Sequence, residues 1–163
     1  MLTYFKITHT DGPTYTFVDD VGMLIPDVAG PTDLAIKIEE RTITNRDRMQ
    51  NQGRIPAYPY HGGMTLEWQG NLFQDTAADY VTERKNLMTA LYGTPDSAPT
   101  SRTPIHLEVE WAGDSEKSYC DCILMDASLP IQAGYPAFTK YMITFYSFKP
   151  WFIGSSSGNL HYF

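Results

Sequence analysis

Short runs in which apolar and polar residues alternate recur along this chain of 163 residues, and only one segment has the spacing of an amphipathic helix. Successive side chains of a strand point to opposite faces, so each alternating run predicts a strand that is buried on one face and wet on the other. Alternation predicts strands at residues 34–39, 64–69 and 105–111. Further strands are predicted at residues 4–7 and 15–18, at residues 119–125 as the return of a hairpin, and at the aromatic-rich residues 138–148. Turn signals such as Asp11-Gly12-Pro13 separate neighbouring strands.

The one predicted helix covers about residues 76–92. Thr76 followed by Asp79 matches a capping box, and Gly93 suits the left-handed position that ends many helices. Its buried face is expected to carry Tyr80, Leu87, Met88 and Leu91. Strands on both sides of a single helix predict a mainly β fold, a β-sandwich or barrel with one flanking α-helix, rather than alternating α/β.

Composition excludes several classes of protein. Twelve Lys and Arg against 19 Asp and Glu give a formal net charge of −7, which argues against a generic basic nucleic-acid binder. The apolar runs are far shorter than the ~20 residues that span a bilayer, and the N-terminus lacks the features of a signal peptide. The length fits one domain, expected at residues 1–152, with residues 153–163 as a C-terminal tail.

One motif resembles the pattern around a catalytic nucleophile. Gly154 to Gly158 reads G-x-S-x-G, and His61-Gly62-Gly63 faintly resembles an oxyanion loop. That chemistry needs a strand, a turn and a helix around the serine, with an Asp and a His later in the chain. Only five residues follow Gly158, so a flexible Ser/Gly tail is the favoured interpretation.

The remaining candidate side chains favour structural roles. Cys120 and Cys122 share one strand face about 7 Å apart, a spacing that strains a disulfide, and zinc would need two further ligands. Two buried core thiols are therefore expected. The two pairs of neighbouring acids, Asp19-Asp20 and Glu39-Glu40, would point to opposite sides of a strand and so do not converge on one site. The four histidines are scattered without the spacing of metal ligands: His9, His61, His106 and His161. The sequence predicts no catalytic residue, no cofactor site and no metal site, and hence no enzyme.

A basic segment stands out from the acidic chain. Residues 41–63 lack apolar periodicity and predict a long loop or hairpin arm. Arg41, Arg46, Arg48 and Arg54 against Asp47 give this arm a charge of +3, which leaves −10 for the rest of the chain. Because most oligomers are symmetric homo-oligomers, we interpret the four arginines as an inter-subunit interface, with a partnerless solvated loop or an anion or nucleic-acid site as alternatives. Acids that could pair with them on the next copy are Glu108, Glu110 and Asp114.

The order of elements also resembles a known family. The run from Gly63 to Phe73, ending a strand near Gly70, leads into the helix that ends at Gly93, and hairpins and an aromatic run from Tyr141 to Phe152 follow. This succession, with Lys149-Pro150-Trp151 as its x-Pro-aromatic end and an Arg-containing loop before it, resembles the N-terminal domain of the distal tail proteins of long-tailed bacteriophages.

The resemblance implies a tail-tube-like β-sandwich that assembles into a hexameric ring. Such a ring joins the tail tube to the tail hub or baseplate in the virion, lets DNA pass through its lumen, and is assembled in the host cytoplasm. The implied partners are other copies of the chain, the tail-tube protein and hub or baseplate proteins, with only transient DNA and no membrane. No catalytic residues carry over, and the carbohydrate-module-like second domain of many members is expected to be absent because the chain stops soon after Pro150.

Two rival functions remain. One is the tail-tube protein itself, which stacks many rings. The other is a carbohydrate-binding β-sandwich that uses Trp68, Trp111 or Trp151 as a stacking platform. Trp68 and Trp111 end apolar strand faces and are expected in the core, whereas Trp151 follows Pro150 and is the one candidate for exposure.

Overall fold

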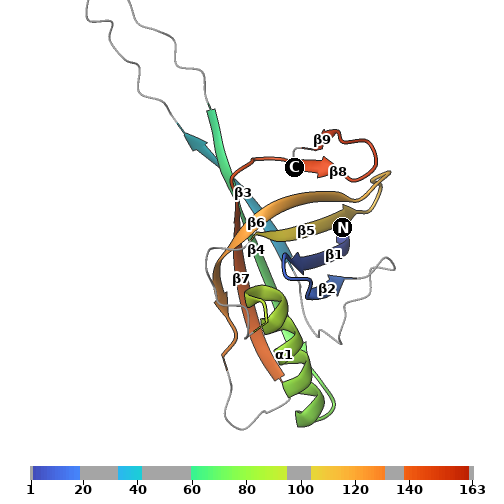
Figure 1. Cartoon of the computed structure of the whole chain (residues 1–163), viewed down its shortest axis with the longest axis vertical. Helices are drawn as coiled ribbons and strands as arrows, with labels where there is room; N and C mark the ends of the chain where they lie inside the picture. The colour runs from blue at the N-terminus through green and yellow to red at the C-terminus, as the bar shows by residue number, and fades with distance from the viewer. Residues whose placement is uncertain (1, 19–32, 42–59, 95–103, 131–137, 162–163) are drawn as a thin grey trace, which may run out of the picture.

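The computed structural model describes residues 2–18, 33–41, 60–94, 104–130 and 138–161 (Figure 1). The elements in chain order are β1 (Leu2–His9), β2 (Thr14–Val18), β3 (Asp33–Arg41), β4 (Tyr60–Phe73), α1 (Ala77–Tyr92), β5 (Ile105–Trp111), β6 (Ser118–Ser128), β7 (Phe138–Ser147), β8 (Phe152–Gly154) and β9 (Leu160–His161). Within these residues, no helix is long and apolar enough to cross a membrane.

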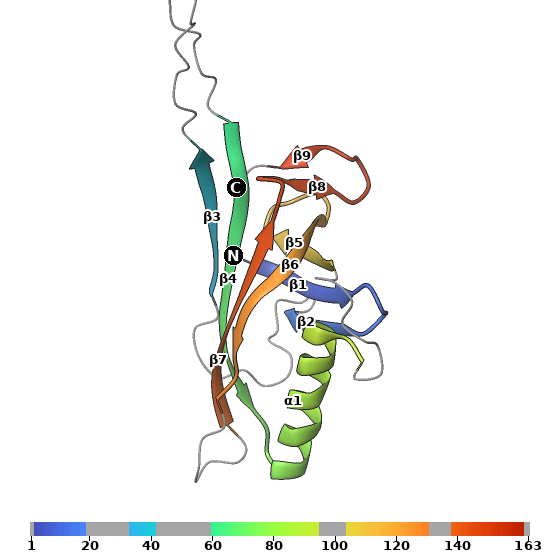
Figure 2. The same ribbon diagram turned by 60° about the vertical axis from the view of Figure 1, so that its left-hand side comes forward.

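All the strands belong to one antiparallel sheet, in the order β2-β1-β5-β6-β7-β4-β3, with β8 beside β6 and β9 beside β8. The sheet curls into a half-barrel, and α1 packs against β1, β2 and β4 (Figure 2). The mainly β fold with one flanking helix, predicted from the sequence, is confirmed.

Strand β6 joins the two halves of the curled sheet. Its residues 118–122 pair with β5, and its residues 123–128 pair with β7. A bulge between Leu124 and Asp126 interrupts the second pairing, and bulges bend and twist a strand. We call β2, β1, β5 and the start of β6 the β1 half, and the end of β6 with β7, β4 and β3 the β7 half.

An aromatic cluster connects the two halves through the core. The Trp68 ring of the β7 half lies 4.7 Å from Phe5 and 5.4 Å from Phe17, both of the β1 half. The Trp68 indole N–H donates a hydrogen bond of 3.1 Å to the Tyr141 hydroxyl. Burial raises the pKa of Tyr141 to about 12, so the hydroxyl stays neutral. These contacts join the two halves of the curled sheet across the core.

Strand β4 is longer than predicted because Gly70 does not end it. Gly70 lies opposite Tyr141 in the register, and β4 continues to Phe73. A Cβ at Gly70 would lie 2.7 Å from the Tyr141 hydroxyl oxygen. The glycine therefore makes room for the Tyr141 ring, rather than breaking the strand.

Helix α1 begins and ends as predicted. The Thr76 hydroxyl accepts a hydrogen bond of 3.2 Å from the Asp79 N–H and donates one of 2.6 Å to the Asp79 carboxylate. At the other end, Gly93 has a φ of +81°, and its N–H donates to the Thr89 carbonyl at 2.8 Å. The predicted apolar face is confirmed, with Met88 partly buried and with four buried residues: Tyr80, Leu87, Ala90 and Leu91.

The predicted arm is shorter at its base than the range 41–63. Arg41 is the last residue of β3 and pairs with Tyr60, the first residue of β4. Residues 60–63 are therefore strand, because antiparallel pairing with β3 continues up to this point. The rest of the arm, residues 42–59, lies outside the described residues.

Candidate functional site

The face of the β7 half that points away from the core carries polar and acidic side chains. Met64, Leu66 and Trp68 point inward, so strand alternation turns the residues between them outward. The register places the half-buried Thr144 of β7 between the exposed Glu67 of β4 and the exposed Asp126 of β6. Two carboxylates therefore flank the middle of this outward face.

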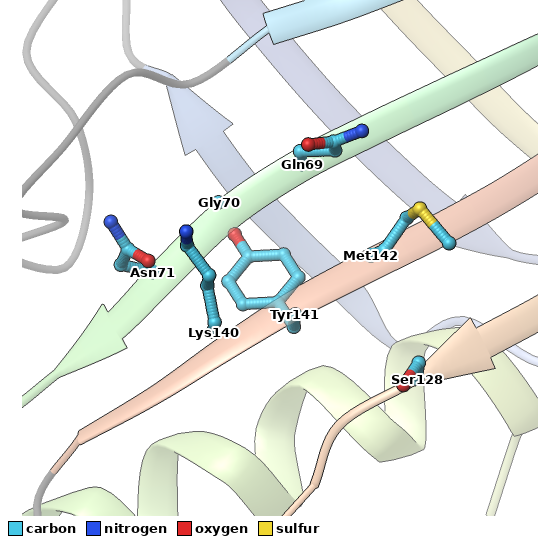
Figure 3. Close-up of a pocket in the computed structure, with 7 residues that line it drawn as sticks. All are labelled: Gln69, Gly70, Asn71, Ser128, Lys140, Tyr141 and Met142. Atoms are coloured by element: carbon cyan, nitrogen blue, oxygen red, sulfur yellow. The ribbon is translucent and has the colours of Figure 1, made fainter.

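A shallow depression lies at one end of the same face (Figure 3). Its volume is about 240 Å³, and its lining residues are Gln69, Gly70, Asn71, Ser128, Lys140, Tyr141 and Met142. In the register Lys140 pairs with Asn71, and Met142 pairs with both Gln69 and Ser128. The depression offers amides, a hydroxyl and one positive charge, which suit hydrogen bonding rather than covalent chemistry.

The β7 half has an open edge on each side. Among the described strands, β3 pairs only with β4, and residues 123–128 of β6 pair only with β7. At the bulge on this second edge, Met125 is 55% exposed. Open edges present unpaired N–H and C=O groups and are sites where another chain can add to a sheet.

The arginines of the predicted interface are only partly placed. Arg41 ends β3 at one open edge, whereas Arg46, Arg48 and Arg54 lie in residues 42–59, outside the described residues. Of the acids named as their partners, Asp114 accepts a hydrogen bond of 3.2 Å from the Trp111 N–H and so holds the β5–β6 turn.

The other two acids, Glu108 and Glu110, lie on the outward face of the β1 half. Glu108 is 3.8 Å from the Lys6 ammonium and 3.9 Å from Nε2 of His106. Nδ1 of His106 lies 3.0 Å from a carboxylate oxygen of Asp121. The sequence patterns did not predict this cluster of Lys6, His106, Glu108 and Asp121, although the predicted hairpin could have placed His106 opposite Asp121. Within the described residues, no group of three or more His, Cys, Asp or Glu is placed to hold a metal ion.

The serine motif forms a turn between two strands. Gly154 ends β8 and the chain returns as β9, so Ser156 does not lie between a strand and a helix. The Glu116 carboxylate accepts hydrogen bonds from the Ser156 N–H at 2.7 Å, from the Ser157 N–H at 2.9 Å and from the Ser157 hydroxyl. The expected flexible tail is thus a hairpin, because a distant carboxylate satisfies the donors of its turn.

We expect Glu116→Gln to loosen this hairpin without unfolding the domain. A neutral amide is a weaker acceptor than a carboxylate, and charge-assisted hydrogen bonds contribute about 1.5–3 kcal/mol each in favourable sites and less when exposed. Hydrogen exchange of the Ser156 and Ser157 amides should accelerate. Ser156→Ala is the matched control because it keeps the N–H that donates to Glu116. Equal exchange in Glu116→Gln and the unchanged chain would contradict the assigned role.

The cysteines and tryptophans mostly lie where the sequence placed them. Cys120 and Cys122 are free and buried, and the Cys122 thiol donates to the Ile105 carbonyl at 3.3 Å. The hydrogen bond with Cys122 and burial raise the pKa of the Cys120 thiol. Both thiols are therefore core residues, as predicted. Trp68 is 1% exposed, as predicted. Trp111, predicted in the core, is instead half-buried and packs against the core, and Trp151, the candidate for exposure, is also half-buried.

Comparisons with known proteins bear on the fold. No family model matches the sequence, and no curated protein matches it. A chain of the phage P2 baseplate, in its activated conformation with Ca, superposes with a TM-score of 0.53 at 15% identity, over 89% of this chain and 44% of that chain. The same baseplate with Sr gives a TM-score of 0.52 at 14% identity, over 87% of this chain and 43% of that chain.

This chain spans somewhat less than half the length of the baseplate chains it matches. The resemblance to phage tail proteins that the order of elements predicted is confirmed at the level of the fold. The chain has the fold of a phage baseplate protein.

Proposed function

We propose that this chain is a structural subunit of a long-tailed phage tail tip or baseplate, forming a ring that joins the tail tube to the tail hub and lets DNA pass. The observation that carries the proposal is the fold shared with the P2 baseplate chain over 89% of this chain. The partners in this proposal are other copies of the chain, the tail-tube protein and hub or baseplate proteins, in the tail of the virion.

The open edges of the β7 half support ring assembly. In a head-to-tail ring, each copy uses two different surfaces, and β3 and the end of β6 are two different open edges of one sheet. The β3 edge of one copy then lies beside the β6 edge of the next, and the β7 halves line a lumen. The arm follows Arg41, which ends β3 at this same edge, and we assign its arginines to the neighbouring copy.

The outward face of the β7 half supports the passage of DNA. In the ring this face, with Glu67 and Asp126 flanking Thr144, is turned to the lumen. Tight DNA binding depends on several Lys and Arg contacts with phosphates, whereas the exposed charges named on this face are two acids, Glu67 and Asp126, and one base, Lys140. A net charge of −7 for the whole chain agrees with a conduit.

The mass and symmetry of the purified assembly test this function. A closed ring of six copies of 18.4 kDa, about 110 kDa in total, is the expected result by native mass spectrometry and electron microscopy. Open-ended stacks of rings would instead assign the chain to the tail tube. A monomer at all concentrations would contradict the ring, and a monomer that binds sugars would favour the carbohydrate module.

A further inference from the structure

The β1 half has an open edge of its own at β2. Strand β2 pairs only with β1 among the described strands. The proposed ring uses β3 and the end of β6, so it leaves the β2 edge unoccupied. Figure 2 shows the C-terminal part of α1 lying beside β2.

The backbone of β2 offers hydrogen-bonding groups along this edge. The His9 N–H donates to the Pro13 carbonyl at 2.8 Å, so His9 and Pro13 form a hydrogen-bonded pair. Bonded and non-bonded pairs alternate along an antiparallel ladder, so Tyr15 is the next β2 residue bonded to β1. The N–H and C=O groups of Thr14 and Thr16 therefore point away from β1. Within the described residues, no hydrogen bond reaches them from that side.

These groups face a groove between β2 and α1. The groove has a volume of about 360 Å³ and is lined by residues 13–16 on the strand side and by Glu83, Lys85, Asn86 and Thr89 on the helix side. Because α1 lies against β2, the edge of a second folded sheet would meet the helix, whereas a single added strand needs space only along β2. Neighbouring strands lie about 4.8 Å apart, so such a strand would fill the space next to β2.

The charges of the groove are balanced and already partly paired. Burial, together with the neighbouring Glu83 carboxylate, raises the pKa of the Tyr15 hydroxyl. The Asn86 amide donates a hydrogen bond of 3.4 Å to the same carboxylate. Lys85 is exposed. The proximity of Tyr15 and Glu83 shows that the side chains of β2 and α1 meet at the groove.

We propose that the β2 edge is a docking site for a single extended, uncharged segment of another polypeptide, which adds to the sheet as a strand alongside β2. The N–H groups of Thr14 and Thr16 are donors, and their C=O groups are acceptors, so together they match the backbone of an added strand. An anion would pair only with the donors. One acid and one base in the lining give no net charge, so the groove favours uncharged polar side chains over acidic or basic ones.

The test uses the whole chain and a synthetic peptide. The probe is the capped peptide Thr-Ser-Thr-Val-Thr-Ser-Thr, and the measurement is site-resolved hydrogen exchange of the Thr14 and Thr16 amides. At a peptide concentration ten times its dissociation constant, exchange at both amides should slow about tenfold. A matched pair of variants isolates the edge donor: Thr16→Pro should abolish the effect, and Thr16→Val, which keeps the N–H, should retain it.

Each alternative occupant gives a distinct result. The same peptide with alternate N-methylated amides should have no effect, and equal slowing by it would overturn strand addition. Protection of Thr14 and Thr16 that rises with chain concentration in the absence of peptide would assign the edge to a second copy. Tighter binding of a peptide flanked by Glu or Lys residues would overturn the uncharged occupant. Ring assembly, measured separately by native mass, does not depend on these outcomes.

Discussion

Trp68→Ala is expected to lower the free energy of unfolding by about 3–5 kcal/mol, the range for truncating a large aromatic core residue. Trp68 is 1% exposed and touches Phe5 and Phe17 from the opposite half of the sheet. The change leaves a cavity between the halves and also removes the N–H that donates to the buried Tyr141 hydroxyl. Leaving a buried polar group without its partner lowers the free energy of unfolding by a further ~1–3 kcal/mol. Urea unfolding monitored by circular dichroism measures the loss.

Two controls separate packing from hydrogen bonding. Trp68→Phe keeps most of the apolar surface and loses only the donor, so it should cost less than Trp68→Ala. Combining Trp68→Phe with Tyr141→Phe removes both partners of the bond and should recover part of that cost. A Trp68→Ala chain that unfolds at the same urea concentration as the unchanged chain would show that the aromatic cluster does not hold the two halves together.

Local signals account for the parts of the fold that the sequence predicted well. The helix depends on Thr76, Asp79 and Gly93, whose capping bonds connect residues three or four positions apart. Strand alternation likewise needs only near neighbours, so the core positions of β4 and β5 followed from the sequence. The outward direction of Glu67 could be read from the same alternation.

Features that depend on distant residues could not be predicted in this way. Gly70 looked like the end of a strand because its partner, Tyr141, lies far along the chain. The turn at Ser156 looked flexible because Glu116, which binds its amides, belongs to another hairpin. The open edges of the candidate site depend on the order of the strands in the sheet, which local periodicity does not determine.

Reversing two charges of the arm is expected to weaken ring assembly. Residues 42–59 carry Arg46, Arg48 and Arg54 against Asp47, a charge of +2, and Arg46→Glu with Arg48→Glu changes it to −2, the same sign as the rest of the chain. A segment of about 18 residues whose sequence lacks apolar periodicity is costly to order alone, so we assign it to the neighbouring copy. Like charges placed across an interface oppose association as well as removing attraction. Sedimentation velocity of the double variant beside the unchanged chain is the measurement.

The size of the effect follows from the symmetry of the ring. One exposed ion pair contributes only about 0–1 kcal/mol, too little to break a single interface. A closed ring repeats the same interface at every copy, so a small loss per interface is multiplied around the ring. Arg46→Lys with Arg48→Lys keeps the charge and should assemble, although Lys cannot reproduce bidentate pairing. Intact rings of the charge-reversed chain that no longer bind DNA would reassign the arm to nucleic acid, because the arginines would then act on phosphates and not on the neighbouring copy.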